Sequence, residues 1–158
     1  MAAVDRPNLF EPALDFDDSD PEGYRAGMDR MGPRIGAERL GASVYELPPG
    51  QSVCPYHYEH AEEEWLIALS GRPTLRTPAG EEELAAGDVV CFTPGPSSAH
   101  KVTNETDETV RVLMFSEVRY PAVTVYPDSD KIGVYTGDRA EDVIVSRASA
   151  VDYYDGEP

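Results

Sequence analysis

The amino-acid sequence predicts an all-β protein, built as a barrel or sandwich of short strands. From about residue 42 onward, short apolar runs alternate with clusters of Gly, Pro, Asp and Asn. Regularly spaced short strands separated by turn residues are typical of sandwiches and barrels. Apolar residues at helical spacing form no long competing pattern.

The length and charge of the chain limit its organisation and its partners. The chain has 158 residues, with 30 acidic and 13 basic side chains and a formal net charge of −17. Such a length fits one domain, in which we expect an arm over 1–40, a barrel core over 41–120, and strands and a tail over 121–158. A strongly negative surface repels phosphate backbones and anionic lipid, so we expect neither nucleic acid nor a membrane as a partner.

The sequence also predicts a cytoplasmic location. The N-terminal residues lack the charged region and apolar run of a secretory signal, and no apolar stretch approaches the ~20 residues of a membrane span. Cys54 and Cys91 are too few for a disulfide framework. Their apolar and aromatic neighbours predict buried free thiols.

The first 40 residues carry weak structural signals. Residues 1–22 are acidic and proline-containing without a regular period, which predicts an extended arm lying across the barrel or a partner subunit. Asp20 and Pro21 could begin a short helix as its N-cap and first residue. Gly32 and Pro33 would end that helix early.

The remaining sequence contains apolar runs of strand length. The predicted strands cover residues 43–47, 52–59, 64–70, 73–78, 81–86, 88–94, 99–104, 109–116, 122–127, 131–135 and 142–147. Three successive glutamates, Glu81 to Glu83, are expected on an exposed strand edge, where charge discourages pairing with another sheet.

Strand alternation places several polar side chains on defined faces. His100 and Val102 share one face of their strand, which predicts that His100 points inward. His57 and Glu59 are two positions apart and are therefore expected on the same side.

The strand over 64–70 has two different faces. Glu64 shares one face with Leu66 and Ala68. The opposite face carries three large apolar residues: Trp65, Ile67 and Leu69. An apolar face of this kind needs a cover, from either the N-terminal arm or a second copy of the chain.

The histidines of the chain are confined to two short segments. His57 and His60 lie between Gly50 and Gly71, and His100 lies in the segment that runs from Gly87 to Asn104. His and carboxylate side chains together suit divalent ions such as Fe, Mn, Zn or Ni. Side chains from neighbouring strands can converge on one ion inside a narrow barrel.

The two segments resemble the signature motifs of the cupin superfamily. The first motif usually runs from a Gly through a His-x-His pair and a Glu to a closing Gly, and His57, Glu64 and Gly71 match it. The second motif usually runs from a Gly through Pro-x-Gly to a His and an Asn. The matching residues here are Gly87, Pro94, Gly95, His100 and Asn104.

The resemblance has departures as well as matches. The motifs span residues 50–104, and the loops before His57 and His100 are slightly longer than usual. Glu59 stands where the second histidine of the first motif is expected. The resemblance implies an all-β cupin (jelly-roll) barrel with one divalent metal, and Glu59 leaves its ligand set open.

Three ligand sets are compatible with the sequence. We take His57, Glu59, Glu64 and His100 as the predicted metal ligands. In a second set His60 turns inward and Glu59 outward, which requires a bulge in the strand. In a third, Glu59 is a catalytic general base or a hydrogen-bond acceptor beside three protein ligands.

Neighbouring residues have simpler explanations. Glu62 and Glu63 are expected to be solvated turn residues, although Glu63 would replace Glu64 if the turn were one residue longer. Tyr45, Tyr56, Tyr58 and Met114 could line a pocket, but a structural role in packing is the default for all four.

The resemblance implies a metal-dependent enzyme acting on a small organic substrate, since the superfamily includes isomerases, cyclases, decarboxylases and dioxygenases. The fold does not select among these reactions. Two carboxylates on the ion would weaken its Lewis acidity, which favours isomerase or lyase chemistry over hydrolysis. The alternative is a non-catalytic barrel that binds a small ligand as a sensor or storage module. Cupins commonly pair, so we expect a homodimer.

Overall fold

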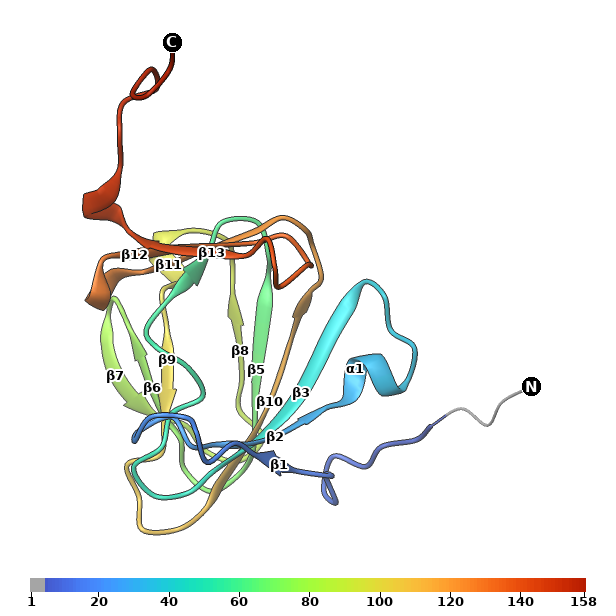
Figure 1. The fold of residues 1–158 in the computed structure, drawn as a ribbon. Helices are drawn as coiled ribbons and strands as arrows, with labels where there is room; N and C mark the ends of the chain where they lie inside the picture. Colours follow the sequence, from blue (N-terminus) through green and yellow to red (C-terminus); the bar gives the residue numbers. More distant parts are fainter. Residues whose placement is uncertain (1–4) are drawn as a thin grey trace.

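The computed structural model describes residues 5–158, and its strands form three antiparallel sheets (Figure 1). The largest sheet has the order β1-β2-β3-β10-β5-β8. Its strands are β1 (Asp15–Phe16), β2 (Gly27–Arg30), β3 (Leu40–Leu47), β10 (Val110–Glu117), β5 (Glu64–Ser70) and β8 (Val89–Phe92).

Two smaller sheets complete the barrel. One is β7 (Gly80–Glu83), β6 (Thr74–Thr77) and β9 (Lys101–Thr103), which faces the large sheet in Figure 1. The other lies across one end and contains β13 (Val143–Ser146), β12 (Lys131–Tyr135), β11 (Ala122–Tyr126) and β4 (Tyr58–Glu59). This arrangement confirms the predicted all-β barrel.

Apolar side chains fill the space between the six-stranded and three-stranded sheets. Alternate residues of β5, Leu66 and Ala68, point into this core, and Val110 and Val112 of β10 lie beside them. Burying each large aliphatic side chain contributes about 1.5–3 kcal/mol. The predicted faces of β5 are therefore confirmed, and Glu64 at its start shares the inward face.

The outer face of β5 is covered by the same chain. Ile67 and Leu69 pack with Leu9 of the N-terminal arm and with Met31 of the short helix α1 (Met31–Arg34). Trp65 stays 37% exposed. The arm therefore supplies part of the expected cover, and Trp65 remains partly exposed.

The helix predicted at Pro21 does not form, and the strand predicted over 52–59 is shorter than expected. No helix begins at Pro21, where the chain makes a turn closed by the Tyr24 amide on the Pro21 carbonyl, and residues 27–30 instead pair with β3. Pairing in the sheet thus overrides the weak capping signal. Residues 52–57 are mostly not strand, because Pro55 lacks a donor and only isolated bridges form there.

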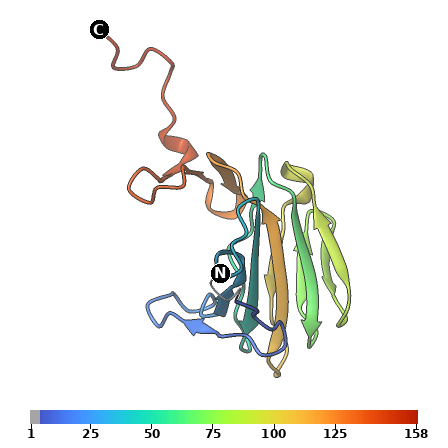
Figure 2. The same ribbon diagram turned by 90° about the vertical axis from the view of Figure 1, so that its right-hand side faces the viewer.

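Three further features lie outside the barrel core. Cys91 is exposed, which corrects the expected buried thiol, since β8 turns Phe92 inward and Cys91 outward. Glu81 to Glu83 are exposed on β7 as expected. The segment after β13 extends away from the barrel in both views (Figures 1 and 2).

Among residues 5–158, no helix has the length and apolarity that crossing a membrane requires.

Candidate metal centre

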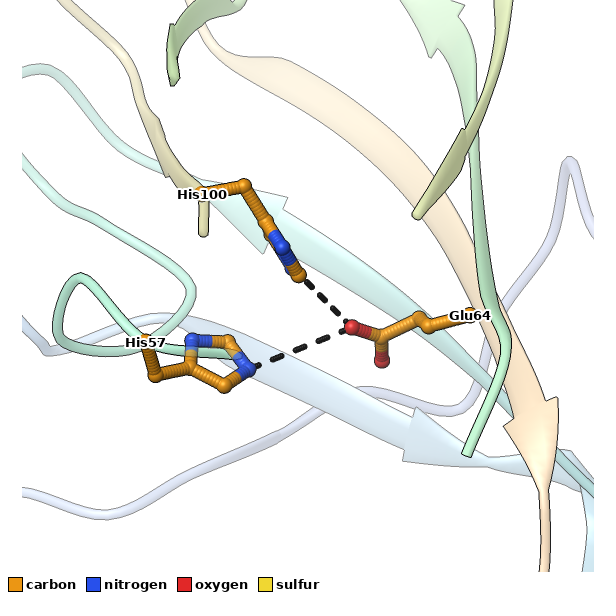
Figure 3. A group of neighbouring side chains, drawn as sticks. All are labelled: His57, Glu64 and His100. Atoms are coloured by element: carbon orange, nitrogen blue, oxygen red, sulfur yellow. Dashed lines mark hydrogen bonds and ion pairs between the residues drawn. The ribbon is translucent and has the colours of Figure 1, made fainter. Parts of the chain in front are cut away.

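Three of the predicted site residues meet inside the barrel. His57 and His100 are joined by a pair of backbone hydrogen bonds, from the His57 amide to the His100 carbonyl (3.1 Å) and the reverse (2.8 Å). Glu64 reaches the same point from the first position of β5. Figure 3 shows the three side chains pointing toward one another.

The candidate ligand atoms lie close together. The His100 Nε2 atom is 3.0 Å from Glu64 Oε2, and the His57 Nε2 atom is 4.0 Å from the same oxygen. All three ligand atoms fit within 4.8 Å of one another. Ligands at about 2.1 Å from a common ion are separated by comparable distances, so small side-chain movements would suffice for binding.

Backbone carbonyls orient both imidazoles. The Nδ1 atom of His57 lies 2.9 Å from the Pro55 carbonyl oxygen, and Nδ1 of His100 lies 3.0 Å from that of Ser98. A ring that donates its Nδ1–H to a carbonyl presents Nε2 to a metal. The two Nε2 atoms are thus positioned as ligands.

Packing holds the same two rings in place. His100 is 1% exposed and stacks on Phe92, with ring centroids 3.6 Å apart and planes 6° from parallel. His57 is 6% exposed, and its ring centroid is 4.6 Å from that of His100. Burial of two imidazoles beside a carboxylate is costly unless the group is paired or coordinates an ion.

Glu59 lies at the edge of this cluster. Its Oε1 atom is 2.9 Å from His57 Nε2, so both side chains lie on the same side, as strand alternation predicts. The group of atoms that could share one ion contains His57, Glu64 and His100 but not Glu59. In this arrangement Glu59 accepts from His57, and its role as a fourth ligand stays a prediction.

Charge couples His57 to its neighbours. Burial disfavours the charged imidazole, but the adjacent Cys54 sulfur and the Glu59 carboxylate outweigh that effect and raise the pKa of His57 to about 12. For Glu59, burial acts to raise the pKa, whereas the hydrogen bond to His57 and the charges of both site histidines lower it below its usual value. Without an ion, a proton on His57 supplies the positive charge.

The structure separates the other candidate residues from the cluster. His60 is exposed and turned outward, with its ring edge against Tyr58, so it takes no part in the cluster. Glu63 is also exposed and accepts a hydrogen bond from the Trp65 indole at 2.9 Å. In this structure neither His60 nor Glu63 belongs to the group of side chains that could share one ion.

Glu62 is buried, which corrects its expected place in a solvated turn. It is 6% exposed, and within residues 5–158 neither of its buried carboxylate oxygens has a hydrogen-bond partner. Burial and the charge of Glu59 raise the pKa of its carboxyl group. The sequence carries no signal for this burial, because the burial of a residue in the loop before β5 depends on tertiary contacts.

A pocket opens beside the cluster. Its volume is about 280 Å³, and Glu59, Glu62 and Glu64 line it together with Tyr45 and Met114. Other polar lining residues are Arg30, Ser43, Ser116, Glu117, Arg119 and Thr124. Of the four pocket candidates in the sequence, Tyr45 and Met114 line this pocket and Tyr56 and Tyr58 do not. Arg30 lies outside both motifs and has no sequence signal.

Two motif residues have structural roles. Asn104 is fully buried, and its side-chain amide donates to the carbonyls of Leu47 (2.8 Å) and Glu108 (2.7 Å). Gly71 ends β5 with a φ of +74°, and a Cβ atom there would lie 2.8 Å from Val110. Asn104 links the end of β3 to the loop before β10, and Gly71 allows the turn after β5 to approach Val110 closely.

Comparisons with known proteins place the chain. A family model for the cupin domain matches residues 43–116. No curated protein matches the sequence significantly. A solved structure of a proposed sugar phosphate isomerase from Acidithiobacillus ferrooxidans has 27% identity and a TM-score of 0.75, covering 82% of this chain and 81% of its own.

Two further structures share the fold. A sugar phosphate isomerase of the cupin superfamily from Silicibacter pomeroyi has 20% identity and a TM-score of 0.78, covering 96% of this chain and 98% of its own. The polyketide cyclase RemF from Streptomyces resistomycificus has 21% identity and a TM-score of 0.61, covering 76% and 84%. With both histidine segments inside one antiparallel barrel, residues 43–116 form a cupin domain, and the chain shares the fold of these structures.

Proposed function

We propose that this cupin is a metal-dependent enzyme that acts on a small organic substrate. His57, Glu64 and His100 would hold one divalent ion of Fe, Mn, Zn or Ni. The observation that carries the proposal is the convergence of two carbonyl-oriented Nε2 atoms on one buried carboxylate. The pocket that shares Glu64 gives a substrate access to that ion.

The ion would act as a Lewis acid that polarises a carbonyl or hydroxyl oxygen of the substrate. Glu59 lines the same pocket and is held beside His57, so it can accept a proton from a bound substrate. A carboxylate in this position suits isomerase or lyase chemistry. The similarity to a proposed sugar phosphate isomerase at 27% identity supports the isomerase class.

Glu59 also favours a second candidate, a non-catalytic barrel that binds a small ligand. It replaces the second histidine of the usual motif and pairs with His57 at 2.9 Å. An acid in this place could keep His57 protonated and leave the site weakly metallated. Metal content and turnover distinguish the two candidates.

Elemental analysis of protein purified without chelators tests the first step. We expect about one divalent ion per chain, removed by dialysis against a chelator and restored by Mn²⁺, Fe²⁺, Zn²⁺ or Ni²⁺. The restored protein should then convert members of a panel of aldose and ketose phosphates, followed by proton NMR. Stoichiometric metal without turnover of any substrate class would favour the binding module, and absence of metal would refute the proposal.

A further inference from the structure

Arg30 presents an unpaired positive charge to the pocket beside the metal cluster. It is the last residue of β2 and pairs in register with Ser43 of β3, and both residues line the pocket. The arginines that form ion pairs with carboxylates in the described part of the chain are Arg34, Arg72, Arg76, Arg111 and Arg119. Arg30 has no such partner there, although acidic residues outnumber basic ones by 30 to 13.

The remaining charges of the pocket are largely compensated. Each of three acidic lining residues has a basic neighbour within 3.0 Å: Glu59 has His57, Glu64 has His100, and Glu117 has Arg119. After these pairs are counted, Arg30 and Glu62 are the charged lining residues without an ion-pair partner in residues 5–158. A ligand that fits the pocket therefore has to satisfy both groups.

Glu62 needs hydrogen-bond donors from the ligand. Its side chain is 94% buried and lines the pocket, with both oxygens free of partners among the described residues. An unsatisfied buried carboxylate is costly. Hydroxyl groups line the same wall, contributed by Ser43, Tyr45, Ser116 and Thr124. These groups can exchange hydrogen bonds with several ligand hydroxyls at once.

We propose that the pocket binds a small polyhydroxylated anion, with Arg30 holding its phosphate or carboxylate group and Glu62 accepting hydrogen bonds from its hydroxyls. Guanidinium is suited to bidentate contact with either anion. The volume of about 280 Å³ accommodates a small sugar acid or sugar phosphate. The inference deepens the proposed function, since it assigns the substrate class to that same site.

A zwitterionic ligand is the main competitor. An ammonium group could pair with Glu62 while a carboxylate pairs with Arg30. The hydroxyl-rich wall favours the polyhydroxylated ligand, because serine, threonine and tyrosine side chains recognise hydroxyls and do not need an ammonium group. An amino acid probe such as L-serine distinguishes the two chemistries.

Calorimetric titration of the metal-loaded protein tests the proposal. The probes are D-glucose 6-phosphate, D-gluconate, D-glucose, inorganic phosphate and L-serine. We expect at least one of the two sugar anions to bind roughly ten- to hundredfold more tightly than D-glucose, as a charge-assisted pair would give. Comparing the phosphate with the carboxylate probe identifies which anionic group Arg30 prefers.

Variants separate the two ends of the ligand. Arg30→Gln should weaken the binding of the sugar anions roughly tenfold and leave the affinity for D-glucose unchanged. Glu62→Gln should weaken the binding of the sugar anions, because contacts to their hydroxyls are lost. It should not weaken the binding of inorganic phosphate, because the substitution removes a negative charge. Arg139→Gln is the matched control, since it removes the same charge from an exposed loop residue that does not line the pocket.

The failures of the two proposals are distinguishable. His100→Ala should lose metal yet keep the preference for the sugar anion over D-glucose, because Arg30 and Glu62 remain. Equal affinity for D-glucose and both sugar anions, or no effect of Arg30→Gln, would overturn the inference whatever the metal content. Tighter binding of L-serine than of either sugar anion would overturn it in favour of the zwitterion.

Discussion

The Nε2 atom of His100 lies 3.0 Å from the Oε2 atom of Glu64, although 36 positions separate the two residues in the chain. This contact exists because Glu64, at the start of β5, and His100, directly before β9, both point into the barrel. In the structure this contact is a hydrogen bond, with its proton between the nitrogen and the oxygen. A divalent ion would replace that proton. The expected effects of metal on stability and of pH on metal affinity depend on this exchange.

Replacing His100 with alanine should abolish stabilisation by metal. At a free metal concentration about 100 times the dissociation constant, binding stabilises the parent by about 2.7 kcal/mol. For a chain of this length, that corresponds to an increase in Tm of roughly 5–10 °C. Differential scanning fluorimetry with and without Mn²⁺ or Zn²⁺ measures the shift. His60→Ala, a change of the exposed histidine, should respond like the parent.

Glu64→Gln and Glu59→Gln should behave differently. Glu64 supplies the oxygen shared by both histidines, so its replacement should remove stoichiometric metal from the purified protein. Glu59→Gln should keep the metal and lose turnover, since Glu59 lies outside the group of atoms that can share one ion. Loss of metal from both variants in elemental analysis would instead make Glu59 a fourth ligand.

Metal uptake should release protons and strengthen as the pH rises. The pKa of His57 in the metal-free protein is raised to about 12, so the imidazole is protonated at neutral pH, and an ion can bind Nε2 only after that proton leaves. Titration calorimetry in two buffers of different ionisation enthalpy measures the protons released. The apparent affinity should fall as the pH is lowered from about 8 to 6. An affinity independent of pH would contradict this exchange.

Asn104→Ala should destabilise the fold by about 2–6 kcal/mol. The residue is fully buried and donates to two carbonyls, which would both lose a partner at a cost of about 1–3 kcal/mol each. Urea unfolding measures the change. Asn8→Ala removes an exposed asparagine that accepts one local backbone hydrogen bond, and it should cost less than about 0.5 kcal/mol.

A homodimer stays a prediction, based on the pairing that is common among cupins. Small-angle scattering at micromolar concentration should give about twice the chain mass of 17.3 kDa. A mass equal to one chain would contradict it. The outer face of β5 is partly covered by the same chain, since Leu9 and Met31 lie in one cluster with Ile67 and Leu69.

Much of the fold could be predicted from alternation along single strands. The strands at 64–70 and 110–117 have a buried and a less buried face, and local sequence contains that pattern. The helix expected at Pro21 is wrong because the pairing of Gly27 with Glu46 depends on a distant strand. Local propensity carries no information about such a partner.

The candidate site shows the same limit. His57, Glu64 and His100 could be identified because spacing and residue chemistry mark potential ligands. Burial of Glu62 and exposure of Arg30 to the pocket depend on how loops and strand ends close over the barrel. No periodic pattern in the sequence carries that tertiary information.

Each imidazole takes its orientation from a carbonyl two positions earlier in its own segment, Pro55 for His57 and Ser98 for His100. The direction of both nitrogen donors is thus encoded in stretches of three residues. Wall side chains that do not touch the rings, unlike Phe92 on His100, can change without turning either ring. Substitutions among the pocket-lining side chains can therefore change the ligand preference while His57, Glu64 and His100 keep the same geometry.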